Sequence, residues 1–156
     1  MAAQITSTEA QNSSSSSSSS SLPLNGRVAI VTGGSRGIGR AIATHLHGLG
    51  AKLVINYASS NSTQADQLAS ELNSCENTQS KAIAVRADVS DPEQVKHLFD
   101  RAEQEFETQA HIVVNCAGIL DPKYPTLAET SVEDWDKTFS VNARGHFWYL
   151  GRRRGG

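Results

Sequence analysis

The sequence predicts an α/β protein with a doubly wound parallel sheet that is incomplete after its fourth strand. Short apolar runs alternate with segments of helical periodicity four times in succession, and a glycine-rich turn joins the first run to the first helical segment. Apolar runs without polar alternation are typical of strands that are covered on both faces. Strict alternation of strand and helix implies parallel strands joined by right-handed crossovers.

Four segments are predicted as strands because they are short and rich in β-branched or small apolar residues. They are residues 27–32 (RVAIVT), 52–56 (KLVIN), 81–86 (KAIAVR) and 111–115 (HIVVN).

A helical segment is predicted after each strand, with apolar residues three and four positions apart. In residues 37–49 and 63–75 the expected inward residues are Ile38, Ile42, Leu46 and Leu49, then Ala65, Leu68, Leu72 and Cys75. Gly50 gives the first of these helices its stop signal.

The third helix is predicted to begin at Pro92, with Asp91 as its cap, because proline suits the first helical position. Its buried stripe is predicted to be Val95, Leu98, Phe99, Ala102 and Phe106. Residues 121–125 contain two prolines and are predicted as a loop. The last helix is predicted over residues 131–150, with Ser131 and Asp134 in a variant of the capping box.

Composition divides the chain into three parts. Residues 1–25 contain nine consecutive serines, and we expect a disordered tail because this segment has little apolar surface to bury. Residues 26–150 are the predicted folded domain. Residues 151–156 (GRRRGG) form a basic, glycine-rich tail.

Charge and residue usage exclude several function classes. Lys and Arg number 14 against 16 Asp and Glu, so the net charge of −2 argues against nucleic acid or a membrane surface as partner. No apolar run approaches the roughly 18 residues that span a bilayer. The two cysteines and five histidines lack metal-type spacing, so no metal site is predicted.

The first predicted strand leads directly into a glycine-rich turn, residues 32–39 (TGGSRGIG). Glycine allows a tight turn, close approach of the backbone to a pyrophosphate, and close packing of helix on sheet. The N-terminus of the following helix offers free N–H groups and a positive dipole to an anion. With a strand before and a helix after, the turn favours dinucleotide binding over a purely structural role.

The charges near this turn favour NADP over NAD. NAD sites usually place an acid about twenty residues after the turn, where it accepts from the ribose 2′-hydroxyl. No acid occurs between Ala10 and Ala65, and Asn56 lies where that acid is expected. Arg36 lies inside the turn, where a guanidinium could pair with a 2′-phosphate, and Ser59 could add a neutral hydrogen bond. The alternative is that Arg36 is only a solvated turn residue.

These motifs together resemble the short-chain dehydrogenase/reductase family. The TGxxxGxG spacing lies in residues 32–39, Asp88-Val89 follows the third strand, and residues 115–118 (NCAG) match the NxAG motif. Val141-Asn142 lies in the last helix, where the family has a catalytic asparagine. The resemblance covers residues 26 to about 150, and within the family it is to plant NADPH-dependent aldehyde reductases.

The resemblance implies a Rossmann-type fold, NADP(H) as cofactor, a small carbonyl or alcohol as substrate, and a homo-oligomer for a full-length form. It implies Asn142 as the catalytic position and a set of cofactor-binding residues. These are Gly33, Ser35, Arg36, Gly37, Ile38, Gly39, Asn56, Ser59, Asp88, Val89, Asn115, Ala117 and Gly118.

The residues that the family uses for proton transfer have no counterpart here. The family pairs a tyrosine with a lysine four residues later, because an unassisted phenol with a pKa near 10 is a poor base at neutral pH. Residues 57, 124 and 149 are the tyrosines, and none is followed by lysine at that spacing. Two hypotheses therefore remain: an NADP-dependent oxidoreductase, or a truncated, inactive chain that binds at most a nucleotide or a full-length relative.

The sequence leaves the location open between two compartments. Two thiols in an α/β chain fit a reducing compartment, so the cytoplasm is expected. The alternative is the chloroplast, because transit peptides are rich in serine and poor in acids. Against that alternative, the tail has no Lys or Arg before Arg27.

Overall fold

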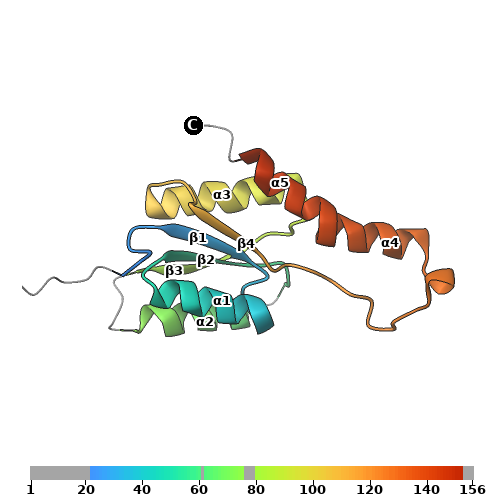
Figure 1. The fold of residues 1–156 in the computed structure, drawn as a ribbon, viewed down its shortest axis with the longest axis horizontal. Coiled ribbons are helices and arrows are strands. Elements are labelled where there is room, and N and C mark those ends of the chain that lie inside the picture. Colours follow the sequence, from blue (N-terminus) through green and yellow to red (C-terminus); the bar gives the residue numbers. More distant parts are fainter. Residues whose placement is uncertain (1–21, 61, 76–79, 153–156) are drawn as a thin grey trace, which may run out of the picture.

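The computed structural model describes residues 22–60, 62–75 and 80–152. These residues form a parallel sheet with helices on both faces (Figure 1). The serine tract and the last four residues lie outside the described residues. Within the described residues, no helix is both long enough and apolar enough to cross a bilayer.

The sheet confirms the predicted doubly wound topology. Its strands are β1 (Val28–Thr32), β2 (Lys52–Tyr57), β3 (Ala82–Arg86) and β4 (Ile112–Asn115). They pair in parallel in the order β3-β2-β1-β4. Each strand begins or ends within one residue of its predicted bounds, because the buried apolar runs leave little choice of register.

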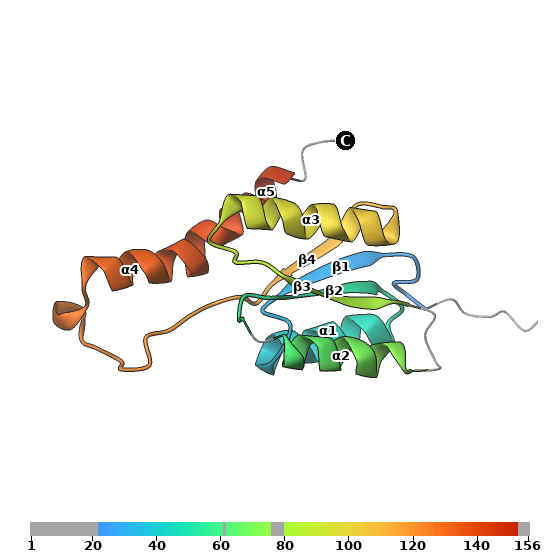
Figure 2. The same cartoon turned by 180° about the vertical axis from the view of Figure 1, so that it is seen from behind.

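Two layers of helices bury the two faces of the sheet, as the view from behind also shows (Figure 2). Helices α1 (Gly37–Gly48) and α2 (Thr63–Asn73) cover one face, and α3 (Pro92–Phe106) and α5 (Gly145–Arg152) cover the other. Alternate β1 residues enter different cores: Val28 and Ile30 pack with α3, and Ala29 and Val31 pack with α1 and α2. Such double burial explains why β1 reads as a continuous apolar run.

Helix α3 matches its prediction in detail. The Asp91 carboxylate accepts from the N–H groups of Glu93 and Gln94, and Pro92 occupies the first helical position. Hydrogen bonds from the Gln94 side chain and the Glu93 N–H lower the pKa of Asp91. All of the predicted inward residues are buried: Val95, Leu98, Phe99, Ala102 and Phe106.

Two predicted core residues are wrong. Ile38 is 77% exposed, because the buried line of α1 runs through Gly39, Ala43 and His47, one position further along the helix. Cys75 is exposed because α2 ends at Asn73, so that Cys75 lies beyond the helix and off the sheet.

The predicted last helix is two helices in the structure. Ser131 caps α4 (Val132–Phe139) by accepting from the Asp134 N–H, as predicted, but a π-helical turn over Ser140–Arg144 separates α4 from α5. A short 3-10 helix, η1 (Leu127–Glu129), precedes α4 and was not predicted. Figure 1 shows α4 and η1 projecting beyond the sheet, away from both cores.

The described part begins at Leu22, four residues before the predicted domain start at Gly26. The Leu24 N–H donates to the Leu49 carbonyl at 2.9 Å, and the Leu24 side chain packs against the core beneath α1 and α2. At the other end, Gly151 and Arg152 continue α5, although the sequence places them in a separate tail.

Helix α1 packs unusually close to the end of β1. A Cβ atom added at Gly39 would lie 2.3 Å from the Gly33 carbonyl oxygen, which is far inside van der Waals contact. The obstacle is backbone, so a larger residue at position 39 would have to move the whole helix or the turn.

We therefore expect Gly39→Ala to destabilise the chain by about 1–3 kcal/mol, the usual cost of overpacking. Gly48→Ala is the matched control, because Gly48 lies in the same helix and an added Cβ would meet nothing within 4 Å. Gly48→Ala should raise the free energy of unfolding by no more than about 1 kcal/mol, because alanine favours the helix more than glycine does. Urea denaturation measures both, and equal stability of the two variants would contradict the packing argument.

Candidate cofactor site

The candidate site residues gather where the carboxyl ends of the parallel strands meet. The chain leaves β1 toward β2 by way of α1, and it reaches β4 from β3 by way of α3 on the opposite face. The crossovers therefore diverge between β1 and β4. Ligands of open α/β sheets bind in the crevice at such a switch point.

Two loops with glycine flank this point. Gly33 has a φ of +61° and Gly37 a φ of +56°, a region that side chains other than glycine rarely adopt. A Cβ at Gly33 would lie 3.0 Å from the Ala117 Cα and the Cys116 carbonyl oxygen, so the β1 turn packs directly on the loop after β4. The structure thus brings together the predicted residues Gly33 and Ala117, which are far apart in the sequence.

The N-terminus of α1 is left open for an anion. Its cap residue, Arg36, makes no side-chain capping bond, and the first turn contains no acidic residue. The leading N–H groups of a helix have no partner within the helix, and they form the positive end of its dipole. The turn that contains Ser35, Gly37 and Ile38 therefore presents backbone donors. The exposed apolar side chain of Ile38 lies beside them.

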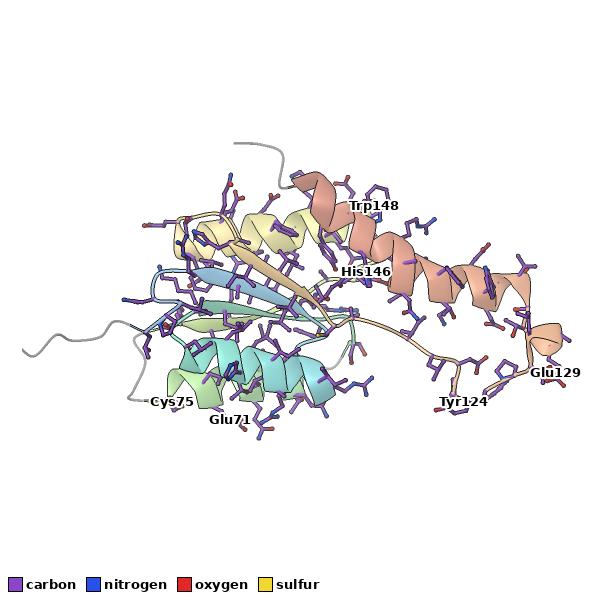
Figure 3. The ribbon with its side chains drawn as sticks, viewed as in Figure 1. Glu71, Cys75, Tyr124, Glu129, His146 and Trp148 are labelled. Atoms are coloured by element: carbon purple, nitrogen blue, oxygen red, sulfur yellow. The ribbon has the colours of Figure 1, made fainter. Side chains whose placement is uncertain are left out.

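The two arginines of this region have different environments. The Arg40 guanidinium pairs with the Glu71 carboxylate at 2.6 Å. Figure 3 labels Glu71 on α2, on the α1–α2 side of the sheet. Arg36 is exposed, and no carboxylate within the described part of the chain pairs with it. Arg36 is therefore the better placed of the two for a phosphate.

Asn56 has a structural role that the sequence did not predict. It is 1% exposed, and its amide nitrogen donates to the Ala87 carbonyl at 2.9 Å and the Val85 carbonyl at 3.4 Å. The backbone carbonyl of Asn56 accepts from the Gly34 N–H at 2.9 Å, and this bond connects the glycine turn to β2. Ser59 is exposed, two residues beyond the end of β2.

Thr32 joins the ends of β1 and β4. Its buried hydroxyl donates to the Asn115 side-chain oxygen at 2.9 Å and accepts from the N–H groups of Cys116 at 3.2 Å and Ala117 at 3.1 Å. The sequence identified Thr32 only as part of a motif. Thr32 is a hydroxyl residue at the end of an otherwise apolar strand. That position could have indicated a bonding role, because buried hydroxyl groups nearly always have hydrogen-bond partners.

The predicted residues after β3 lie in a tight turn against α5. One Asp88 carboxylate oxygen accepts from the Ser90 N–H at 2.9 Å and the Ser90 hydroxyl at 2.7 Å. Val89 is 3% exposed and belongs to the α3–α5 core. A Cβ at Gly145 would lie 2.9 Å from the Val89 carbonyl oxygen, so Gly145 lets α5 approach this turn.

Asn142 reaches the loop after β4 from the π-helical turn. Its amide nitrogen donates to the Ile119 carbonyl, and its oxygen accepts from the Ile119 N–H, both at 2.8 Å. A Cβ at Gly118 would lie 3.4 Å from that oxygen. The reciprocal bonds fix Asn142 beside Gly118. A single widened turn of this kind inside a helix is frequent at functional sites.

Tyr149 is buried between α5 and α3. It is 6% exposed and packs against Phe99, with 6.0 Å between ring centroids. Burial raises the pKa of its phenol, the Asp88 charge raises it further, and the Thr32 hydroxyl opposes the shift. Figure 3 shows its neighbours His146 and Trp148 on the same helix, far from Tyr124 on the projecting segment.

Within the described residues, no three His, Cys, Asp or Glu side chains gather closely enough to hold a metal ion. The site is instead built from backbone donors, one arginine and several short polar side chains. Backbone donors and a guanidinium suit a phosphate-bearing ligand.

Comparison with known proteins places this geometry in a family. The short chain dehydrogenase profile matches residues 27–152. An NADPH-dependent aldehyde reductase-like protein, chloroplastic, from Arabidopsis thaliana is 60% identical over 132 residues, which cover 81% of this chain and 48% of that protein. NADPH-dependent aldehyde reductase 2, chloroplastic, from the same plant is 50% identical over 133 residues, covering 81% and 48%.

A solved structure gives the same result. A short chain dehydrogenase from Burkholderia cenocepacia J2315, in complex with NADP, superposes with a TM-score of 0.74 at 36% identity, covering 82% of this chain and 49% of that one. The chain thus spans about half the length of the proteins it matches. With its glycine turn, its NCAG loop and a profile match over nearly all of the described residues, the chain belongs to the short chain dehydrogenase family.

Proposed function

We propose that this chain supplies the cofactor-binding half of an NADP(H)-dependent oxidoreductase that acts on a small carbonyl or alcohol. The observation that carries the proposal is the exposed Arg36 beside the uncapped N-terminus of α1, with no acid in the first helical turn. A guanidinium and free N–H groups favour a phosphorylated ligand, whereas a carboxylate there would repel a 2′-phosphate.

The relatives support both the cofactor and the substrate class. Two are named as NADPH-dependent aldehyde reductases or reductase-like proteins, and the Burkholderia structure holds NADP. When bound, the nicotinamide supplies hydride to a carbonyl or accepts it from an alcohol. All other steps fall to the protein, which must bind, orient and protonate.

The residues present fit that cofactor. Gly33 and Gly39 let the turn pack against the loop after β4 and let α1 begin close to the end of β1, and an added Cβ at Gly37 would meet nothing within 4 Å. The uncapped N-terminus of α1 would provide donors for the pyrophosphate. We propose that Asp88 and Val89, in the turn after β3, contact the adenine, and that Asn115, Ala117 and Gly118, at the end of β4 and in the loop after it, also contact the cofactor. We propose that the exposed Ser59 adds a neutral hydrogen bond to the cofactor. Asn56 contributes indirectly, by holding β3 and the glycine turn in place.

For Asn142 we propose a positioning role in proton delivery. Its side chain is held by the Ile119 backbone, so its own backbone in the widened helical turn would be the part that orders a water near the substrate. The 156 residues contain no Tyr-x-x-x-Lys pair to complete this chemistry.

The alternative function is an inactive chain that binds only nucleotide or a full-length relative. The burial of Tyr149 favours this alternative. Tyr149 lies in α5, which directly follows the π-helical turn that contains Asn142. An open reading frame that continues into a Tyr-x-x-x-Lys segment would decide for the oxidoreductase.

Cofactor preference tests the proposal directly. NADPH should bind more tightly than NADH, and Arg36→Ala should remove most of the difference, about 10- to 100-fold for a charge-assisted contact. Arg40→Ala is the matched control, because Arg40 is already paired with Glu71. Fluorescence titration with both cofactors measures the affinities. Equal affinity of the unaltered chain for NADPH and NADH would contradict the proposal.

Catalytic turnover separates the two candidate functions. The 156-residue chain should show no NADPH-dependent aldehyde reduction above background, because Asn142 alone cannot replace the missing acid–base residues. The loss of NADPH absorbance in the presence of an aldehyde measures this turnover. Turnover that Asn142→Ala abolishes would show that the chain is itself an enzyme.

For location we propose the plastid, the alternative that the sequence left open. Two relatives at 60% and 50% identity are named chloroplastic, and the N-terminal segment is rich in serine. Residues 1–30 fused to a fluorescent protein should direct it to chloroplasts in leaf cells, and diffuse cytoplasmic fluorescence would refute this location.

A further inference from the structure

The turn between β3 and α3 lies at the same edge of the sheet as the glycine turn, and Asn56 connects the two. The Asn56 backbone carbonyl accepts from the Gly34 N–H, and the Asn56 side-chain amide donates to the Ala87 carbonyl, both at 2.9 Å. Asp88 is the next residue after Ala87. These bonds hold the beginning of the turn that contains Asp88 in a fixed place relative to the glycine turn.

The carboxylate of Asp88 has one oxygen in use and one open. Its Oδ1 accepts from the Ser90 N–H at 2.9 Å and from the Ser90 hydroxyl at 2.7 Å. In the part of the chain that the structure describes, no hydrogen bond or ion pair engages Asp88 Oδ2. A carboxylate oxygen accepts hydrogen bonds and cannot donate them, so the open oxygen suits an N–H group of a ligand.

Gln94 holds the backbone of Asp88 by a bond that helix capping does not require. Gln94 is the third residue of α3, where a glutamine usually accepts from the N–H of the cap residue. The cap residue of α3 is Asp91, and its N–H donates instead to the Asp88 carbonyl at 3.2 Å. The Gln94 Oε1 reaches past the cap and accepts from the Asp88 N–H at 2.9 Å.

The other end of the Gln94 amide is fixed by the helix cap. The Gln94 Nε2 donates to Asp91 Oδ2 at 2.9 Å, and Asp91 Oδ1 accepts from the backbone N–H groups of Glu93 and Gln94. An amide turned around would set its NH2 group against the Asp88 N–H, so these bonds determine which end faces Asp88. A continuous set of hydrogen bonds therefore runs from the first turn of α3 to the backbone of Asp88.

We propose that Gln94 is a positioning residue for recognition of the adenine. By fixing the backbone of Asp88, it keeps Asp88 Oδ2 where that oxygen accepts from the exocyclic amine of the base. Ser90 assists by holding the other carboxylate oxygen. The inference rests on the proposed function, in which Asp88 contacts the adenine. Gln94 is exposed, and surface side chains of this kind contribute little to the stability of a fold.

The experiment compares NADPH with its hypoxanthine analogue, in which a carbonyl oxygen replaces the adenine amine. Fluorescence titration of the 156-residue chain measures both affinities. The unaltered chain should bind NADPH about 10-fold or more tightly than the analogue, because the analogue cannot donate to Asp88 and sets an oxygen against the carboxylate.

A matched pair of variants tests the role of Gln94. Gln94→Met keeps the length and the helix propensity of the side chain but removes both amide bonds. It should reduce the preference for NADPH over the analogue to less than about 3-fold. Gln104→Met is the control, because Gln104 is exposed in the same helix and bonds only to Arg101, at 3.3 Å. The control should leave the preference unchanged.

The ratio of the two affinities separates positioning from a structural role. A variant that only loosens the fold would weaken both ligands by the same factor and would leave the ratio unchanged. Should Gln94→Met fail to fold, as judged by urea denaturation, Ser90→Ala takes its place. It removes the hydroxyl bond to Asp88 and keeps the Ser90 N–H, and it should lower the ratio by about 3-fold or more.

An unchanged ratio in Gln94→Met, or in Ser90→Ala where that variant is used, would overturn the inference and would leave the proposed function standing. The same holds if the unaltered chain binds NADPH and the analogue equally well, because Asp88 would then not read the amine. Failure of the unaltered chain to bind NADPH at all would contradict the proposed function and this inference together.

Discussion

The close contact between Gly39 and the Gly33 carbonyl is the constraint on which the rest of the site depends. Only a residue without a Cβ allows α1 to begin so close to the end of β1. This position keeps the first N–H groups of the helix near the carboxyl edge of the sheet, where they can face an anion. It also shifts the buried line of α1 to Gly39, Ala43 and His47, which leaves Ile38 at the mouth of the site.

A second set of contacts connects this turn to the far end of the chain. Thr32 joins the ends of β1 and β4 through its hydroxyl, and Asn142 joins the loop after β4 to the widened turn between α4 and α5. Gly145 then allows α5 to approach the turn after β3. These contacts are polar or depend on glycine, so they require specific residues and not only apolar surface. They explain why residues from four separate motifs meet at one edge.

Much of this arrangement could be predicted from sequence because its causes are local. Asp91 and Pro92 begin α3 by capping and by a fixed φ, and both act within one turn of helix. The buried stripe of α3 follows from periodicity alone. The errors occur where distant contacts decide. Cys75 has helical spacing but lies past the end of α2, and Ile38 lies one position off the line of residues that α1 buries.

The sequence by itself determined the order of strands and helices, the glycine turn, the absence of an acid after the second strand, and the family motifs. Each of these depends on residue types at short spacing. Only the tertiary structure decided that Arg40 pairs with Glu71, that Thr32 bridges two strands, and that the last helix widens at Asn142. These features arise from contacts between residues about 23 to 85 positions apart, and no local pattern encodes which groups meet once the chain is packed.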